Sequence, residues 1–419
     1  MNSVLDELTW RGLIANSTDP EALAAHLDAG PVTFYVGFDP TAPSIHMGNL
    51  VQLMVVRALQ RAGHRPLLLV GGSTGLIGDP KESSERTLNT KDLVGQWVER
   101  IRDQVSRFVS FEGDAAARIV NNYDWTAPMS TIDFLRDVGK HFPVNRMLAR
   151  DVVANRLESG ISYTEFSYVL LQSLDYRELF RSYGCTLQTG GSDQWGNITA
   201  GVELIRRSEG ERVHALATPL VTKADGTKFG KTESGTVWLD AGMTSPYAFH
   251  QFFLNAEDAK VIDYLKVFSE RPRDEIEHLA ELTRTEPHRR AAQHALADDV
   301  TDLVHSVEER RAAVAAASAI FGRGELRELA GSTLDGVVGE LGRHEVPAAA
   351  LPTFVDALVA SGVVASKSAA RRAIEEGGAY LNNEQITDPE RVLGAGDLLA
   401  GGHVLVRRGR RTVGAVTAV

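Results

Sequence analysis

A turn near the N-terminus carries residues suited to binding a nucleotide. Thr41, His46 and Gly48 lie in residues 38–49, between a strand-like stretch and a helix-like stretch. The start of a helix has free backbone N–H groups and the positive end of the helix dipole, so it favours an anion such as a phosphate. Glycine also lets a planar base approach the backbone. The turn therefore indicates a nucleotide site, although a histidine at a helix start is also common as a structural residue.

A lysine-containing loop at residues 223–232 is a second candidate. Lys228 and Lys231 are three positions apart, and Thr232 follows them. Two cations on a flexible segment suit a mobile clamp on a polyphosphate. Taken alone, the segment could equally be an ordinary solvated loop.

A polar stripe on an otherwise apolar helix is the third candidate. Tyr168, Gln172 and Asp175 lie on the helix expected over residues 161–175, spaced so that they share one face. Polar groups on a buried helix must find partners or line a site, because unpaired buried polar groups are costly. A ligand pocket and an internal hydrogen-bond network both satisfy this requirement.

Three better-known patterns are not met. Residues 71–75 fit the G-x-S-x-G elbow of α/β-hydrolases around Ser73, but Gly78 and Pro80 break the helix that must follow. The segment ending in Gly-Lys-Thr fails as a phosphate-binding P-loop, because Asp225 stands where its first glycine belongs. No G-x-G-x-x-G dinucleotide fingerprint follows either strand described next.

Alternating strand-like and helix-like stretches in the first 245 residues predict an α/β layer fold. A strand over residues 32–38, a helix over 49–62 and a strand over 65–70 form one β-α-β unit. A second strand, 186–189, runs into the glycines of 190–193. The turn with His46 and the glycine-rich segments thus follow strands, where α/β proteins bind ligands.

The rest of the chain divides into further regions. Residues 118–160 hold mixed helical sequence that we interpret as an insertion, and residues 246–321 are expected to be helical. Residues 322–350, rich in glycine, are interpreted as a linker, and 351–419 as a small module of two helices followed by short strands. A chain of 419 residues exceeds what one core normally serves, so two or three domains are expected.

Composition narrows the protein class. Hydrophobic residues make up 43% and charged residues 24%, which are ordinary globular values, and the N-terminus lacks the pattern of a signal peptide. A single cysteine, Cys185, allows neither an internal disulfide nor a Cys-rich zinc site. We therefore expect a cytoplasmic protein that spans no membrane and holds no structural metal. The net charge is −11, yet four arginines fall within residues 407–411, a cluster that suits nucleic acid.

Two of these motifs resemble a known pair of sequence signatures. Residues 46–49 (His-Met-Gly-Asn) and 228–232 (Lys-Phe-Gly-Lys-Thr) resemble the HIGH and KMSKS signatures of class I aminoacyl-tRNA synthetases, with Asn49 in place of the second histidine. Residues 75–80, 161–175 and 190–197 resemble the tyrosyl-tRNA synthetase family. The likeness runs from about residue 35 to the C-terminus. The chain is identified as a member of the bacterial tyrosyl family.

The resemblance implies a pocket for L-tyrosine. Tyr35 and Asp175 would hold the tyrosine hydroxyl, while Asp79, Tyr168 and Gln172 would hold the ammonium group. In this reaction the tyrosine carboxylate attacks the α-phosphate of ATP, pyrophosphate leaves, and the amino acid then passes to the terminal ribose of tRNA(Tyr). Mg²⁺ is expected with the ATP.

The resemblance also implies two overlapping residue sets around ATP. Those expected to bind ATP are Gly37, Asp39, Thr41, His46, Gly48, Gly191, Asp193, Gln194, Lys228 and Lys231. Those expected to act in catalysis are Thr41, His46, Asn49, Lys228, Lys231 and Thr232. The loop after Asp79 departs from the family, which often has a lysine where this chain has Glu82 and Ser83; whether Lys81 substitutes is open.

The implied architecture assigns a role to each region. A Rossmann-like parallel-sheet catalytic domain (1–245) carries the mobile loop 223–235 and the insertion of about 118–160, where the family forms a homodimer. A helical domain (246–321) would approach the tRNA anticodon region, and an S4-like α+β domain (351–419) would bind RNA. The residues expected to contact RNA are Lys367, Arg371, Arg372, Arg407, Arg408, Arg410 and Arg411.

Two alternatives remain at this point. A tryptophanyl enzyme would share the fold, but indole has no hydroxyl to satisfy Tyr35 and Asp175. A catalytically inactive relative that only binds RNA would have no need of the four polar residues that this chain keeps: Lys228, Lys231, Asp79 and Asp175.

Overall fold

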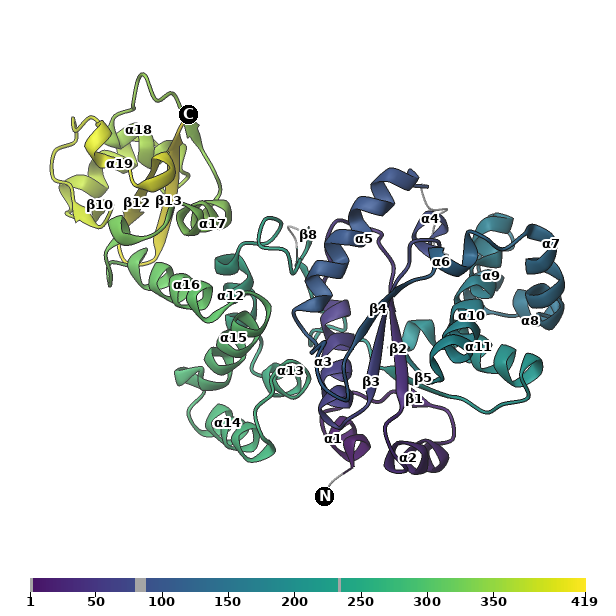
Figure 1. Cartoon of the computed structure of the whole chain (residues 1–419). Helices are drawn as coiled ribbons and strands as arrows, with labels where there is room; N and C mark the ends of the chain where they lie inside the picture. Colours follow the sequence, from purple (N-terminus) through teal and green to yellow (C-terminus); the bar gives the residue numbers. More distant parts are fainter. Residues whose placement is uncertain (1–2, 80–87, 233–234) are drawn as a thin grey trace. The chain divides into compact units, whose positions relative to one another are not determined.

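The computed structural model describes residues 3–79, 88–232 and 235–419. The chain forms two compact units. The first comprises Met1–Asp240 and Glu257–Ala280, and the second comprises Ala241–Ala256 and Glu281–Val419. Figure 1 shows the elements of each unit. Within the described ranges, no helix has both the length and the apolar character needed to cross a lipid bilayer.

A six-stranded sheet with strand order β1-β6-β5-β2-β3-β4 organises the first unit. All neighbouring strands are parallel except the β1–β6 pair. In chain order the strands are β1 (Asn16–Ser17), β2 (Thr33–Phe38), β3 (Arg65–Val70), β4 (Arg118–Asn121), β5 (Cys185–Gly191) and β6 (His214–Thr218). The predicted parallel α/β fold is confirmed. Because β2, β3, β4 and β5 run in one direction, their carboxyl ends meet at one edge of the sheet.

Helices cover both faces of this sheet (Figure 1): α3 (Met47–Arg61) and α5 (Lys91–Ser106) on one face, α10 (Tyr163–Tyr183) and α11 (Trp195–Ser208) on the other. Helix α10 begins after the N-cap Ser162 and ends at Gly184, which adopts φ 62°. Its buried Tyr176 and Leu179 pack against Tyr35 and Leu67 of the sheet. This packing fixes the face of α10 that carries the polar stripe.

Shorter elements complete the first unit. They are α1 (Val4–Trp10), α2 (Pro20–Asp28), α4 (Thr74–Ile77), α6 (Tyr123–Thr126), α7 (Thr131–Asp133), α8 (Val144–Leu148), α9 (Asp151–Ala154), β7 (Lys231–Thr232), β8 (Gly235–Thr236) and α13 (Val261–Phe268), with α14 (Arg273–Thr285) running to its boundary. The predicted insertion begins too early, because residues 118–121 form β4 and pair with residues 67–70 of β3. The inserted sequence therefore follows β4.

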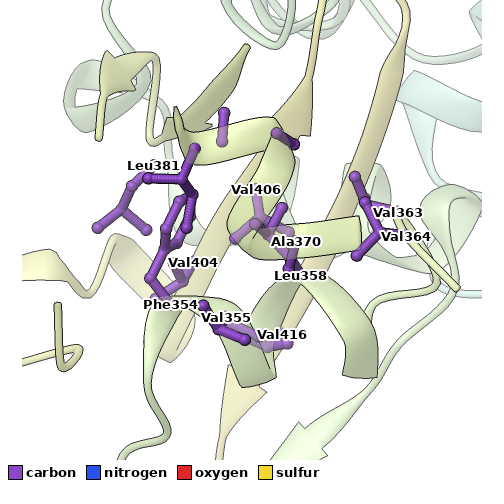
Figure 2. Packing of buried hydrophobic residues seen from close by; sticks show 14 of the residues in the cluster. Phe354, Val355, Leu358, Val363, Val364, Ala370, Leu381, Val404, Val406 and Val416 are labelled. Atoms are coloured by element: carbon purple, nitrogen blue, oxygen red, sulfur yellow. The ribbon is translucent and has the colours of Figure 1, made fainter. Parts of the chain in front are cut away.

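The second unit joins helices to a five-stranded sheet with order β11-β10-β12-β13-β9. Its elements are α12 (Pro246–Leu254), α15 (Ala291–Val304), α16 (Val307–Ala319), α17 (Gly331–Leu341), β9 (Glu345–Val346), α18 (Phe354–Ala360), α19 (Lys367–Glu375), β10 (Ala379–Leu381), β11 (Glu384–Gln385), β12 (His403–Arg408) and β13 (Thr412–Ala418). Figure 2 shows Phe354 and Leu358 packed with Val404, Val406 and Val416. A helix pair followed by short strands is what the sequence predicted for this module.

The stretch 322–350 differs from the linker that was predicted there. It contains helix α17, whose Leu334 and Val338 belong to a buried cluster with Tyr247 and Leu405. Its glycines serve packing: a Cβ at Gly336 would stand 2.6 Å from Oγ of Ser245. A glycine in this stretch therefore allows close packing of α17 against its neighbours and does not mark a flexible linker.

Candidate active site

The carboxyl ends of four parallel strands bring the predicted site residues to one edge of the sheet. Tyr35 and Gly37 lie on β2, Asp39 follows β2, Thr74 follows β3, and Asn122 follows β4. Gly191 ends β5, and Asp193 and Gln194 follow it. Gly37 is solvent-exposed although β3 and β5 flank its strand, so the space above the middle of the sheet is open.

Asp175 and Tyr35 form the buried end of this space. Asp175 is 2% exposed and accepts hydrogen bonds from Nδ2 of Asn122 (3.0 Å) and Nε1 of Trp125 (2.9 Å). Burial raises the pKa of the Asp175 carboxyl to about 7, against the lowering effect of those two donors. The Tyr35 hydroxyl is buried and has no hydrogen-bond partner among the described residues. Because a buried polar atom without a hydrogen bond lowers the stability of the fold, this hydroxyl is suited to a hydrogen bond with a polar group of a ligand.

Tyr168 lies among three carboxylates. Its hydroxyl donates to Oδ2 of Asp39, and its pKa is raised by burial and then by the charges of Asp39, Asp79 and Asp175. Nearby on α10, the buried Oε1 of Gln172 has no partner among the described residues. Three carboxylates and a free amide oxygen favour a cation. The predicted polar stripe therefore faces the site and also belongs to an internal hydrogen-bond network.

Thr74 and Asn122 join Asp39 to Asp175. Thr74 Oγ1 donates to Oδ1 of Asp39 (2.6 Å) and accepts from Nδ2 of Asn122 (3.0 Å). Gly71 makes room for the link, since a Cβ there would stand 2.2 Å from both Asp39 Oδ1 and Thr74 Oγ1. Sequence reasoning missed Thr74, Asn122 and Trp125. The signal available was position alone: Asn122 comes directly after β4, as Asp39 does after β2, and Thr74 and Trp125 lie four positions beyond the ends of β3 and β4.

Asp79 is held by amides that follow β5. It accepts from Nε2 of Gln194 (2.8 Å) and Nδ2 of Asn197 (3.1 Å). Asn197 in turn accepts from the guanidinium of Arg150. Neither Asn197 nor Arg150 was assigned a role from sequence. The predicted loop residues Lys81, Glu82 and Ser83 lie outside the described residues.

The start of α3 has the geometry of an anion site. The Gly48 N–H donates to Nδ1 of His46 (3.1 Å), and the His46 N–H donates to Oδ1 of Asn49 (3.0 Å). Asn49, which replaces the second histidine of the signature, thus caps the helix with its side-chain oxygen. Its amide nitrogen is left to donate to a phosphate. Thr41, His46 and Gly48 are exposed.

The lysine loop packs beside the start of α3. A Cβ at Gly230, which has φ +89°, would stand 2.6 Å from Cβ of Met47. Phe229 stacks on Tyr264 with ring centroids 4.0 Å apart, and the Tyr264 hydroxyl donates to the Thr222 carbonyl (3.0 Å). The two signatures are therefore neighbours. Lys228 is exposed; Lys231 and Thr232 form β7, and their side chains lie outside what the structure describes.

The basic residues of the second unit differ in exposure and in their contacts. Lys367 pairs with Asp356 (2.6 Å), and Arg371 lies 3.7 Å from Glu390. Arg407 is half-buried and lies over the Tyr380 ring at 4.0 Å. The remaining predicted RNA contacts are exposed: Arg372, Arg408, Arg410 and Arg411.

Two family models match the chain. The model described as "tRNA synthetases class I (W and Y)" matches residues 27–322, and "Tyrosine--tRNA ligase SYY-like C-terminal domain" matches residues 340–414. Curated relatives named "Tyrosine--tRNA ligase" are similar over their whole length. The Cutibacterium acnes protein is 67% identical over 417 residues with 100% of both chains covered, and the Kineococcus radiotolerans protein is 58% identical with 99% of both covered.

Solved structures give a consistent comparison. A C-terminally truncated Aspergillus nidulans mitochondrial tyrosyl-tRNA synthetase is 30% identical with a TM-score of 0.69, covering 75% of this chain and 92% of that one. An Archaeoglobus fulgidus tyrosyl-tRNA synthetase complexed with L-tyrosine is 17% identical with a TM-score of 0.56, covering 73% of this chain and 99% of that one. The second of these shows the fold alone.

Proposed function

The chain belongs to the class I tRNA synthetases, in the branch of the tyrosine–tRNA ligases, and on that premise we propose how its residues bind and activate tyrosine. Tyr35 and Asp175 bind the phenol hydroxyl, and Asp79, Tyr168 and Gln172 bind the ammonium group. The observation that carries this assignment is the pair of unpartnered buried atoms, Tyr35 Oη and Gln172 Oε1, at the edge of the sheet where the carboxylates gather.

The hydroxyl end of the pocket explains selection of tyrosine. Asp175 already accepts from Asn122 and Trp125, and a phenol O–H would be a third donor to it while accepting from Tyr35. A substrate without the hydroxyl leaves both Tyr35 and Asp175 short of a partner, which penalises phenylalanine strongly. Tryptophan offers no hydroxyl either, and its indole needs more width.

The ammonium end of the pocket orients the reacting carboxylate. With its cation held among Asp79, Tyr168 and Gln172, tyrosine would direct its carboxylate towards the open space above Gly37. There the carboxylate attacks the α-phosphate of ATP and pyrophosphate leaves, with no protein nucleophile. Catalysis is then positioning together with charge stabilisation that grows in the transition state.

ATP would lie between the start of α3 and the residues after β5. Thr41, His46 and Gly48 supply donors to its phosphates, Lys228 and Lys231 neutralise the departing pyrophosphate, and Gly191, Asp193 and Gln194 border the ribose. Asn49 acts mainly by shaping the turn. Within the described ranges no three His, Cys, Asp or Glu side chains are grouped so as to hold a metal, so Mg²⁺ would arrive with ATP and take its ligands largely from phosphate and water.

Tyrosine-dependent exchange of pyrophosphate into ATP, without tRNA, tests this proposal. Wild-type protein should exchange only with tyrosine, and Asp175→Ala should lose at least about two orders of magnitude in kcat/KM, because it removes a charged partner and strands two donors. Glu178→Ala, on the same helix but facing Arg181, is the matched control. Exchange that prefers tryptophan, or that is unchanged in Asp175→Ala, would refute the assignment.

The insertion suggests a homodimer. Large apolar side chains on and beside α7, α8 and α9 are exposed: Ile132 (68%), Leu135 (47%), Val144 (60%), Leu148 (38%), Leu157 (51%) and Tyr163 (67%). An apolar surface of this kind is typical of a subunit interface. Ile132→Asp with Val144→Asp should shift the protein from dimer to monomer in light scattering, while the same changes at exposed Val307 and Val314 should not.

The second unit would bind tRNA(Tyr) in the cytoplasm. The hairpin of β12 and β13 presents Arg408, Arg410 and Arg411 to solvent, where they can contact phosphates. Changing all three to alanine should weaken aminoacylation most at low salt, make it less dependent on salt and leave pyrophosphate exchange intact. Equal loss in both assays would mean that the hairpin serves the fold.

A further inference from the structure

One cation from the insertion reaches the ammonium end of the pocket. Arg150 follows α8, and its guanidinium donates to Oδ1 of Asn197. The guanidinium lies against the start of α11, since a Cβ at Gly196 would meet Nη2 of Arg150 at 3.4 Å. Arg150 feels the charge of Asp79, which opposes the lowering of its pKa by burial. The guanidinium therefore lies close enough to that carboxylate to interact with it.

The side-chain amide of Asn197 can form hydrogen bonds with both Arg150 and Asp79 in only one of its two orientations. Its Nδ2 donates to Oδ1 of Asp79 (3.1 Å) and to Oε1 of Gln194 (2.9 Å). Turned over, the amide would direct its oxygen at two further acceptors and its NH₂ at a guanidinium, which only donates. Arg150, Asp79 and Gln194 together therefore exclude the reversed amide. Gln194 is fixed in the same way, since its Nε2 donates to Oδ2 of Asp79 (2.8 Å).

We propose that Arg150 is a positioning residue for tyrosine activation: through Asn197 it orients Asp79 to receive the substrate ammonium. The inference rests on the proposed function, in which Asp79 binds that ammonium. Without Arg150, Oδ1 of Asn197 loses its partner and the amide is held less firmly, so Asp79 is fixed less well in the orientation that receives the ammonium. The affinity for the ammonium falls, while binding of the phenol and of ATP does not change.

Arg150 also lines a cavity of about 300 Å³, and this cavity supports a rival interpretation. Arg146, Arg207 and Glu203 also line it, and such a basic hollow could contact RNA. The hydrogen bond to Asn197 favours the positioning role, because it directs the guanidinium away from solvent. Arg146 is the matched control: it lines the same cavity with a side chain 70% exposed and lies 4.0 Å from Glu203.

Inhibition of pyrophosphate exchange by two analogues tests the proposal. Tyramine carries the ammonium group, and 3-(4-hydroxyphenyl)propionate lacks it. Arg150→Met should raise the KM for tyrosine and the inhibition constant of tyramine about tenfold, as expected for one lost hydrogen bond to a charged group. The KM for ATP and the inhibition constant of the propionate should stay within about twofold of the wild-type values. The melting temperature should stay within a few degrees. Arg150→Lys should recover most of the loss, and Arg146→Met should resemble wild type.

Each other result has a defined meaning. Because the two residues act in series, Arg150→Met combined with Asn197→Ala should be no worse than Asn197→Ala alone, and additive effects would overturn the proposal. Equal weakening of both analogues would also overturn it, since Arg150 would then only support the fold. Normal exchange with impaired tRNA charging would assign Arg150 to RNA contact. If wild-type protein shows no tyrosine-dependent exchange, the proposed function itself fails.

Discussion

Removing the hydroxyl of Tyr35 should stabilise the free protein and impair its selectivity. This oxygen is buried on a side chain only 1% exposed and has no partner among the described residues. An unpaired buried polar group costs about 1–3 kcal/mol, so Tyr35→Phe should gain roughly 1 kcal/mol, or about 2–4 °C in melting temperature. Bound tyrosine would lose a neutral hydrogen bond of about 0.5–1.5 kcal/mol, which corresponds to roughly two- to thirteenfold in KM.

The neighbouring Tyr176 provides the control. Its ring centroid lies 5.2 Å from that of Tyr35, and it is fully buried, but its hydroxyl donates to the His214 carbonyl (2.8 Å). Tyr176→Phe should therefore lower the melting temperature and leave the ratio of kcat/KM for tyrosine and phenylalanine unchanged. Thermal unfolding without ligand and exchange with both amino acids measure the two effects. A lower melting temperature for Tyr35→Phe, or an unchanged ratio, would refute the reasoning.

Three further predictions follow from other parts of the fold. Burial raises the pKa of Asp175 to about 7. Because the protonated carboxyl is an uncharged and weaker acceptor for the substrate phenol, the KM for tyrosine should rise as pH falls below about 7 and then level off; Asp175→Asn should give a flat profile. Gly71→Ala should reduce kcat/KM in exchange at least about tenfold by displacing Asp39 and Thr74, whereas Gly95→Ala, in open space on α5, should stabilise the protein by about 1 kcal/mol in chemical denaturation. Burial lowers the pKa of four histidines below 6.5; the folded chain then binds fewer protons than the unfolded chain, so stability should decline as pH falls below about 6.5, and less so when glutamine replaces these residues: His26, His64, His141 and His214.

Sequence patterns located the elements of the site better than the contacts within it. Helical periodicity put Tyr168, Gln172 and Asp175 on one face, and the β-branched and aromatic residues of 32–38 placed Tyr35 on a strand before a proline-containing turn. These signals are local, because a helix period or a strand end is visible within a dozen residues. The roles given to those residues came from family resemblance, and they stay predictions until the variants are measured.

The hydrogen-bond partners were beyond sequence reasoning for a physical reason. Asn122 reaches Asp175 only because β4 lies beside β3, and strand order is not written in either strand. Residues 118–121 form so short a strand that pairing with β3, and not their own pattern, defines it. Arg150 meets Asn197 through the path of the insertion. The glycines of α17 misled in the opposite direction, because they permit close packing at Ser245 as readily as a flexible linker.

The two donors that converge on Asp175 constrain any attempt to evolve this pocket towards other amino acids. An apolar residue at 175, chosen to admit a larger para substituent, would leave one N–H of Asn122 and the indole N–H of Trp125 without an acceptor, at about 1–3 kcal/mol for each. A library that randomises positions 35 and 175 alone would thus discard many workable pockets as poorly folded protein. Randomising positions 122 and 125 together with 35 and 175 avoids the loss of stability from unpaired donors. A new substrate preference is therefore best selected by varying these four positions together.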